Sequence, residues 1–340
     1  MKKYVWIAVS VFCLITILGA AKFFDVKVSP YTIECLDKNE ITSQEKSIIE
    51  KASVNILSMI KRQQANQLWE ISHPQLKSQV ASAQFAQSVT QILLGDTTNA
   101  IILDENLIKI NGSGKTASKV FCGSVNANDP SHLSVQAFIG DTDTAIIQME
   151  VPKKPFSQLV SLQLAKHEGL YRLVSMQLSL DKYNGKNSFY YDALSKKYVD
   201  EKKYMEAFIY NQVALLLSQK GNFLQSALNI QLNADFQKLQ NNQKLKHALE
   251  IWKIDKNQYQ IISLGLITTQ SDMNLHIKYV APQGLQPDQL QQDAEHLMHY
   301  LKQTYPTLNQ EFHGVVFEAY ETMPVDKTKI YPFYRVPIEF

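Results

Sequence analysis

The sequence predicts an α+β protein in which N-terminal helices pack on a curved antiparallel sheet, and a helical hairpin leads to a smaller C-terminal α+β domain. Apolar residues at helical spacing open the body of the chain, whereas residues 158–164 and 171–180 alternate between apolar and polar side chains. A second change from helical to strand patterns falls near residue 247. We therefore expect an export segment 1–24, an α+β domain 31–183, a helical hairpin with a linker 184–246, and a C-terminal domain 247–340.

The composition is that of a globular protein with an electrically neutral body. Of the 340 residues, 45% are hydrophobic and 19% are charged, which excludes wholesale disorder, and the length suits about two domains. The chain has 34 Lys and Arg against 32 Asp and Glu, and removing Lys2 and Lys3 leaves 32 of each sign. A neutral body lacks the basic surface of nucleic-acid-binding proteins, so we expect no nucleic-acid partner.

Residues 1–24 have the pattern of an export signal. Lys2 and Lys3 precede the uncharged stretch 4–21, which ends in small residues. Its length lies between a signal-peptide core of about 7–15 residues and a membrane span of about 20, so cleavage and retention as an anchor both remain open. Either way, the leading lysines place the body outside the cytoplasm, in the periplasm if the source is bacterial. If the segment is retained, residues 4–21 contact the membrane.

The cysteines fit an oxidising compartment. Cys13 lies within the export segment, which leaves Cys35 and Cys122 as an even pair. In an exported protein such a pair either forms a disulfide or remains as two buried thiols, and the sequence leaves both open. A catalytic cysteine is disfavoured, because neither residue has a histidine within a few positions.

The first domain begins with helices and continues with strands. Thr42 and Glu45 have capping-box spacing, and further helical pieces surround Trp69 and Phe85. The first helix carries apolar residues three and four apart, at Ile49, Ala52, Ile56 and Ile60. Strands are expected over residues 100–103, 119–123, 133–139 and 145–151. The alternating arms 158–164 and 171–180 then form a hairpin that turns at 166–169, and each arm should bury one face and expose the other.

Helices followed by a long antiparallel sheet with a final hairpin resemble the nuclear-transport-factor-like cone fold. The resemblance covers about residues 31–183 and rests on this element order, on Trp69 and Phe85, and on the return strand Gly169-Leu170-Tyr171-Arg172. It implies a helical layer packed into a curved sheet around a pocket.

Enzymes of that superfamily place an Asp, Glu or His among the apolar side chains that face the pocket. The apolar faces of the hairpin hold no ionisable group here, which argues against catalysis. Glu150, His73 and His132 could still reach the pocket from other elements. We therefore lean toward a non-enzymatic protein and assign no catalytic residue.

The segment 184–246 opens with two helices. The first carries Tyr191, Leu194, Ser195 and Tyr198 on one side, and after a turn at 200–203 the second carries Tyr204, Ala207 and Ala214. The pattern resembles a single tetratricopeptide-type hairpin, whereas a stable solenoid needs about three units. An ordinary helical hairpin packed on a neighbour is the favoured alternative. A partner-binding surface, if present, is expected at Tyr190, Tyr191, Tyr198 and Tyr204.

The last block has the order β-β-β-α-β. Strands are expected over residues 249–254, 259–268, 273–280 and 312–320. The helix carries Leu290, Ala294, Leu297 and Leu301 and ends before Pro306. The Pro-rich tail should lie extended over the domain surface.

Three motifs suggest binding chemistry, but each has a simpler interpretation. Residues 112–116 look like a phosphate-binding loop, but Lys109 stands where a glycine is required, and a hairpin turn is favoured. His296 and His299 fall on the side of their helix opposite the leucines, so we expect them in solvent rather than on a metal. Asp141 and Asp143 fit a turn. We expect no cofactor and no metal.

The favoured hypothesis is a non-catalytic exported or anchored envelope protein that binds another envelope protein. Type IV secretion systems contain a similar anchored cone-fold subunit, from which this chain departs by the long extension after residue 183. The alternatives are a carrier or sensor that binds a small apolar ligand in the cone, and an enzyme with an unrecognised site. A carrier requires a cavity, an interaction protein an exposed apolar patch, and an enzyme a buried ionisable cluster.

Overall fold

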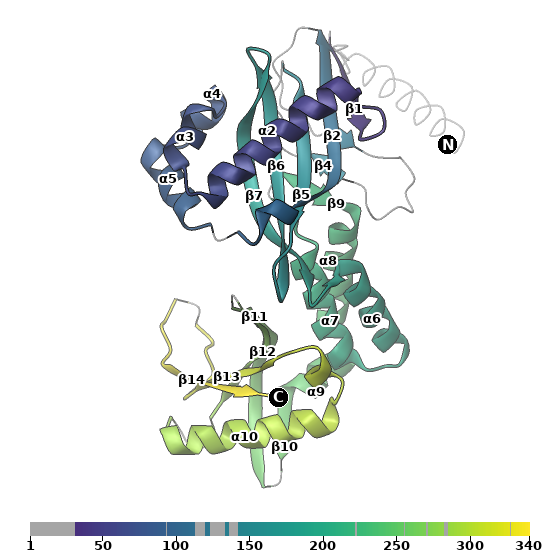
Figure 1. Ribbon diagram of the computed structural model, residues 1–340. Coiled ribbons are helices and arrows are strands. Elements are labelled where there is room, and N and C mark those ends of the chain that lie inside the picture. The colour runs from purple at the N-terminus through teal and green to yellow at the C-terminus, as the bar shows by residue number, and fades with distance from the viewer. Residues whose placement is uncertain are drawn as a thin grey trace, which may run out of the picture.

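The computed structural model describes residues 31–340, apart from 93, 113–119, 123–132, 136–141, 222, 255, 270, 282–284 and 327. The expected export segment 1–24 lies outside the described residues. Within the described ranges, no helix is long and apolar enough to cross a membrane. The fold is α+β as predicted, with two main sheets at opposite ends of the molecule and a group of helices between them (Figure 1).

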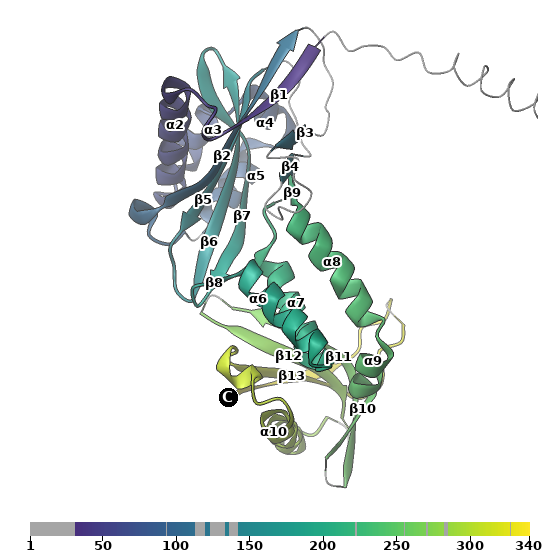
Figure 2. The same cartoon turned by 90° about the vertical axis from the view of Figure 1, so that its right-hand side faces the viewer.

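A curled six-stranded sheet forms the N-terminal half-barrel, and all its neighbouring strands are antiparallel (Figure 2). Its strands, in spatial order, are β1 (Tyr31–Asp37), β2 (Ile101–Gly112), β5 (Thr144–Val151), β6 (Phe156–His167), β7 (Leu170–Tyr183) and β8 (Lys186–Asn187). The predicted hairpin is confirmed as β6 and β7. Its two-residue turn, Glu168-Gly169, has positive φ at both positions, which suits the twist of the flanking strands. Strand β1 precedes the first helix and was not expected from the sequence.

Four helices pack on one face of this sheet, which we call the helix face: α2 (Ser43–Lys61), α3 (Ala65–Glu70), α4 (Pro74–Gln79) and α5 (Ser82–Thr90). A short 3-10 turn, η1 (Thr97–Asn99), leads from them into β2. The N-cap half of the predicted capping box is present, because the Thr42 hydroxyl accepts the Glu45 N–H. The Glu45 carboxylate accepts a hydrogen bond from the Thr42 hydroxyl. Trp69 and Phe85 contact each other with ring centroids 5.3 Å apart.

The opposite face is also covered, which corrects one expectation. A small sheet of β3 (Val120–Cys122), β4 (Leu133–Val135) and β9 (Leu224–Ser226) lies over it (Figure 2). Strand β6 is buried on both faces over residues 156–165, including Ser161 and Gln163. The alternation correctly identified the strand, but the polar face is sheltered by segments distant in sequence.

A disulfide joins Cys35 of β1 to Cys122 of β3, which are 87 residues apart in sequence. The sequence left open whether these cysteines form a disulfide or remain as two buried thiols, and in the structure they form the disulfide. Around it, Ile108, Ile146 and Phe223 form a small apolar cluster between the six-stranded and three-stranded sheets. The disulfide and this cluster together attach the small sheet to the half-barrel.

The predicted helical hairpin is present and is followed by two further helices. These are α6 (Ser188–Asp200), α7 (Tyr204–Leu217), α8 (Ala227–Gln240) and α9 (Gln243–Glu250). Residues 249 and 250, expected in a strand, instead end α9.

The C-terminal sheet has five strands, in the order β10 (Ile251–Ile254), β11 (Asn257–Thr268), β12 (Met273–Val280), β13 (Gly314–Tyr320) and β14 (Phe333–Glu339). Helix α10 (Pro287–Thr304) and the 3-10 turn η2 (Leu308–Gln310) connect the parallel pair β12 and β13. The Pro-rich tail was expected to lie over the surface of the domain. Instead, its strand β14 pairs with β13 and buries Val336 in the core.

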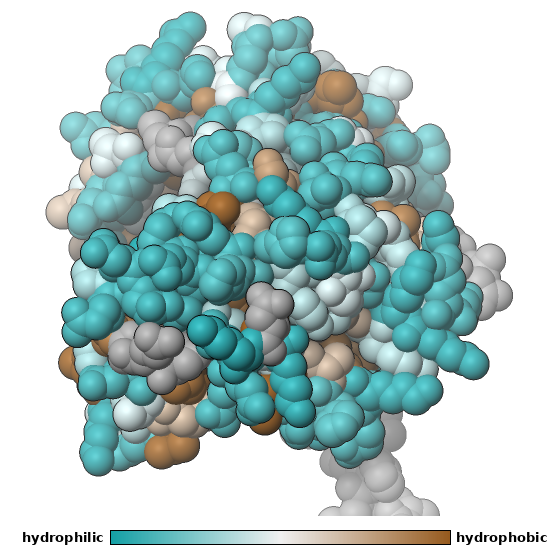
Figure 3. Space-filling model, turned by 90° about the horizontal axis from the view of Figure 1, so that it is seen from below, coloured by the Kyte–Doolittle hydropathy of each residue, from teal (hydrophilic) through white to brown (hydrophobic). Residues whose placement is uncertain are grey.

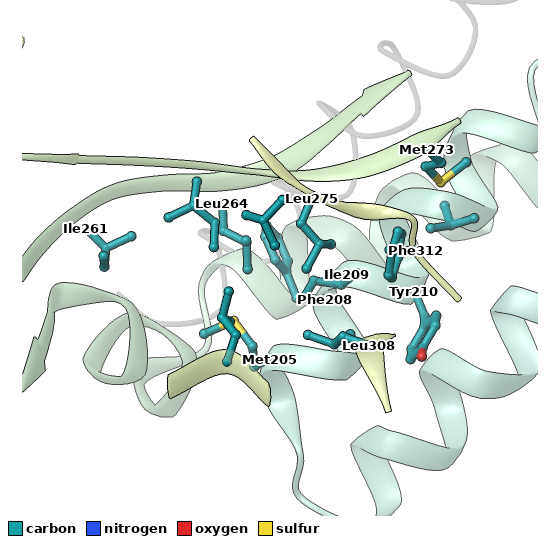
Figure 4. Packing of buried hydrophobic residues seen from close by; sticks show 14 of the residues in the cluster. Met205, Phe208, Ile209, Tyr210, Ile261, Leu264, Met273, Leu275, Leu308 and Phe312 are labelled. Atoms are coloured by element: carbon teal, nitrogen blue, oxygen red, sulfur yellow. The ribbon is translucent and has the colours of Figure 1, made fainter. Parts of the chain in front are cut away.

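The helices share one hydrophobic core with the C-terminal sheet. Met205 and Phe208 of α7 point toward Leu264 and Leu275 of the sheet (Figure 4). Phe156 of β6 and Tyr183 of β7 belong to the same core. The domain boundaries that the sequence predicts at residues 184 and 247 are not tested by this shared core and stay predictions.

Removing the disulfide should destabilise the protein by about 2–5 kcal/mol, because the cross-link closes a long loop in the unfolded chain. The double variant Cys35→Ala/Cys122→Ala should show this loss in urea unfolding. Adding dithiothreitol should lower the stability of the parent but leave the double variant unchanged. Equal stability of the oxidised parent and the variant would contradict a structural role for the bond.

Candidate interaction site

The four tyrosines predicted to form an interaction surface do not lie together on the surface. Tyr191 and Tyr198 are buried, because this side of α6 packs against α7. The Tyr198 ring stacks on Tyr210 with centroids 5.4 Å apart. Tyr204 is half-buried, and only Tyr190, which is 40% exposed, presents much of its ring to solvent. The regular spacing of the tyrosines in α6 therefore reflects its contact with α7. The expectation of a tyrosine surface is wrong for Tyr191 and Tyr198.

The space between the helices and the half-barrel is filled by apolar side chains. Ile56, Leu68 and Leu162 are among the fully buried residues of this core. The grooves described below are open to solvent and lie outside it. A small apolar ligand would therefore have to bind at the surface rather than within this core.

One carboxylate lies on the helix face of the half-barrel, and the sequence analysis did not identify it. Glu105 of β2 is 1% exposed, and neither carboxylate oxygen has a hydrogen-bond partner within the described chain. Burial raises the pKa of Glu105, and the nearby Glu50 raises it further. Catalysis also requires a cavity and a second polar group, and Glu105 lines none of the grooves described below.

The three residues that the sequence analysis placed within reach of a pocket, His73, Glu150 and His132, do not form one site among the described residues. His73 caps α4 by accepting the Gln75 N–H at Nδ1, and its ring contacts that of His167. Glu150 lies on the opposite face of the sheet in an ion pair with Lys182. His132 is outside the described residues. His73 and Glu150 are therefore not brought together into a catalytic arrangement.

An open apolar groove lies between α2 and the start of β7, and we call it the α2–β7 groove. Its volume is about 500 Å³, and Ala52, Ile56 and Ile71 line its floor. Ile48 is 38% exposed and Leu170 is 59% exposed at its edges. Its polar boundary residues are Lys51, Asn55, Glu70 and Arg172. An apolar floor with a mixed-charge rim is the arrangement found in protein interfaces.

A second hollow of about 540 Å³ lies between β7 and the connection from α7 to β9, and we call it the Lys220 cleft. The Lys220 ammonium donates to Gln148 Oε1 at 3.2 Å. Burial lowers the pKa of Lys220, whereas Asp181 and Asp104 oppose that shift. Burial likewise raises the pKa of Asp181, and Glu150 adds to the effect. These groups form a half-buried ionisable cluster on the face opposite the helices.

The cleft depends on a glycine that packs closely against the side chain of Gln177. Gly221 has φ of +117°, and a Cβ there would lie 2.7 Å from Cβ of Gln177 on β7. Only glycine fits both the angle and the space. Gly221 thereby holds the chain against β7 and places Lys220 above Gln148.

A third polar cluster surrounds Glu318 on the C-terminal sheet. This carboxylate is 1% exposed and accepts hydrogen bonds from the side chains of Tyr320, Lys278 and Arg335. The Nε2 atom of His276 also lies 3.2 Å from its Oε2 atom. Burial alone would raise the pKa of Glu318, but these three donors outweigh it and lower the pKa to about 2. Because the carboxylate already has these partners, we interpret the cluster as structural.

Three other sequence motifs were considered as binding sites: the histidine pair, the aspartate pair and the glycine-rich loop. No group of three metal-ligating side chains occurs within the described ranges, and His296 and His299 are exposed as expected. Asp143 forms an ion pair with Lys166 at 3.5 Å, whereas Asp141 is not among the described residues. Gly112 ends β2, and residues 113–116 of the proposed loop are likewise undescribed.

Comparison of the chain with protein-family models, with curated proteins and with solved structures gives no significant match. The candidate site therefore rests on the residues of this chain alone.

Replacing Gly221 with alanine should destabilise the protein more than the same change at Gly169. Gly169 also has positive φ but has open space around it, so Gly169→Ala should cost about 1–2 kcal/mol. Gly221→Ala must also displace the Gln177 side chain, which should add about 1–3 kcal/mol in denaturant unfolding. Equal losses in the two variants would show that Gly221 is not in close contact with the Gln177 side chain.

The Glu318→Gln variant should lose about 3 kcal/mol of stability at pH 7, because three donors lose their charged acceptor. The pKa of Glu318 is lowered from 4.5 to about 2 in the folded state, so its stabilisation is complete above pH 4.5 and lost as the pH falls through about 2. The difference from the parent should shrink over that range in pH-dependent unfolding. Glu321→Gln, at an exposed position, should match the parent throughout, and a constant loss for Glu318→Gln would contradict the charge-based account.

Proposed function

We propose that this chain is a non-catalytic, exported envelope protein that binds another protein through the α2–β7 groove. The observation that carries the proposal is the exposure of Ile48 and Leu170 at the edges of an open apolar groove. Exposed apolar surface of this kind is costly in water and is typical of sites that a partner covers. The view in Figure 3, by contrast, shows a mostly hydrophilic surface with scattered hydrophobic residues on the C-terminal side.

Export is supported by two independent features. The N-terminal lysines and the uncharged stretch 4–21 have the form of an export segment. The second is the disulfide between Cys35 and Cys122, a type of bond that is typical of oxidising compartments outside the cytoplasm. The proposal places the body of the protein in the periplasm if the source is bacterial.

The finer resemblances are part of the proposal. A helical layer on a curled sheet agrees with a nuclear-transport-factor-like cone, and the pair α6 and α7 agrees with one tetratricopeptide-like unit. The alternative function, binding of a small apolar ligand, is favoured only by the apolar floor of the same groove. Its openness supports a polypeptide partner better than a small molecule, which needs most of its surface enclosed.

Photocrosslinking in the native envelope tests this proposal. A photoreactive amino acid at position 170 should give an adduct with one discrete polypeptide, and Ile48→Glu should reduce its yield by about tenfold, because the charge would be desolvated in the interface. The same probe at Val325, which is 80% exposed and outside the groove, serves as the control. Equal labelling from positions 170 and 325, or no polypeptide adduct, would contradict the proposal. An adduct of a few hundred daltons would support the alternative.

A further inference from the structure

Strand β7 has an unpaired outer edge in its middle. Its inner edge pairs with β6 over the length of the strand, whereas β8 pairs only with Lys182 and Tyr183. Near its start, the Leu173 carbonyl accepts the His73 N–H at 2.8 Å. Between these points, residues 175–180 have no strand beside their outer edge within the described chain. Six extended residues span about 20 Å, the length of a typical strand.

This edge lacks the features that normally prevent another chain from pairing. The sequence from 175 to 180 is Ser-Met-Gln-Leu-Ser-Leu, without charge, proline or glycine. The ladder with β6 has an irregularity on each side of this run, where Val174 and Asp181 have no opposite partner, and is regular between them. Exposed edges usually carry charges, prolines or bulges because unpaired N–H and C=O groups attract other strands. The run from 175 to 180 is therefore regular and unprotected.

Few hydrogen bonds from within the described chain satisfy the outward-facing N–H and C=O groups of residues 175–180. The Leu178 carbonyl accepts the side-chain amide of the neighbouring Gln177 at 3.2 Å. A side chain on the same strand can move aside for an incoming backbone donor. All six residues are half-buried, so the edge is accessible but recessed.

Two grooves flank this edge and differ in chemistry. The Lys220 cleft lies on one side, and its lining includes residues 177–180 together with Lys220. On the other side lies a groove of about 430 Å³ with Phe156 and Leu180 in its lining. Because successive side chains of a strand point to opposite faces, an added strand would place alternate side chains in the two grooves.

The space between the walls of these grooves suits one extended segment better than the sheet edge of a second folded molecule. Leu215 and Leu216 of α7 border the cleft, and Thr268 and Thr269 of the β11–β12 turn border the opposite groove. The edge of a second folded copy would have to enter between these walls together with its own neighbouring strand. One extended segment needs only the width of a strand, about 5 Å.

We propose that an extended segment of a partner protein, alternating aliphatic with polar side chains, adds to β7 along residues 175–180. The aliphatic side chains would contact Phe156 and Leu180, and the polar ones would face the cleft in which Lys220 lies near Asp181 and Gln148. The inference rests on the proposed function in that the partner is a protein, but it uses a different surface from the α2–β7 groove.

The test uses the full chain and the peptide Val-Ser-Val-Glu-Val-Ser-Val-Glu, blocked at both ends. Two further versions carry N-methyl groups on the valine nitrogens or on the Ser and Glu nitrogens. An added strand directs alternate N–H groups toward β7, so one methylated version should lose about tenfold in affinity and the other should bind within about threefold of the parent peptide. Amide chemical shifts should change at residues 175–180 and not near Val325.

Equal affinity of the two methylated peptides would overturn the proposal, because the contact would then not involve an ordered backbone ladder. No binding of the parent peptide at about 1 mM, or shifts confined to other regions, would also overturn it. A positive photocrosslink at position 170 with a negative peptide result would leave the groove function standing and reject only the strand addition.

Discussion

The antiparallel ladder between β6 and β7 is the interaction on which the rest of the structure depends. Val160 and Leu162 of β6 and Leu173 of β7 contribute to the core beneath α2–α5. At the other end of the same ladder, Phe156 and Tyr183 belong to the core shared by the helices and the C-terminal sheet. The two large cores are therefore joined through one antiparallel strand pair, whose ladder has irregularities at Val174 and Asp181.

This arrangement leaves β7 with several roles at once. Its start borders the α2–β7 groove, and its middle borders the Lys220 cleft. Beside this part of β7, Leu215 and Leu216 of α7 border the cleft, and Gly221 lies against the side chain of Gln177. A strand that supports two cores is rigid, and rigidity lowers the entropic cost of binding a partner. The position of the grooves along β7 thus follows from the same ladder that stabilises the fold.

The sequence predicted the elements whose signals are local. The hairpin of β6 and β7, the N-cap at Thr42 and the leucine-lined helix α10 all depend on spacing within one segment. Strand β1 was missed because its partner lies about 70 residues later, and residues 31–37 alternate only weakly.

The parts of the site that were missed depend on tertiary contacts. Lys220 acquires its environment from Gln148 on β5, Asp181 on β7 and Asp104 on β2, which no local pattern connects. Tyr191 and Tyr198 were assigned to the surface because a helical stripe does not reveal which neighbour covers it. The burial of Ser161 on the polar face of β6 had the same cause.

Amide hydrogen exchange along β7 tests the central claim most directly. If β7 joins two cores and has an open outer edge, the N–H groups of residues 175–180 that bond to β6 should exchange only with global unfolding. The alternate N–H groups, which point outward, should exchange much faster in the same molecules. Uniform slow exchange would show that the outer edge is already covered, and uniform fast exchange would show that the ladder does not hold the two cores together.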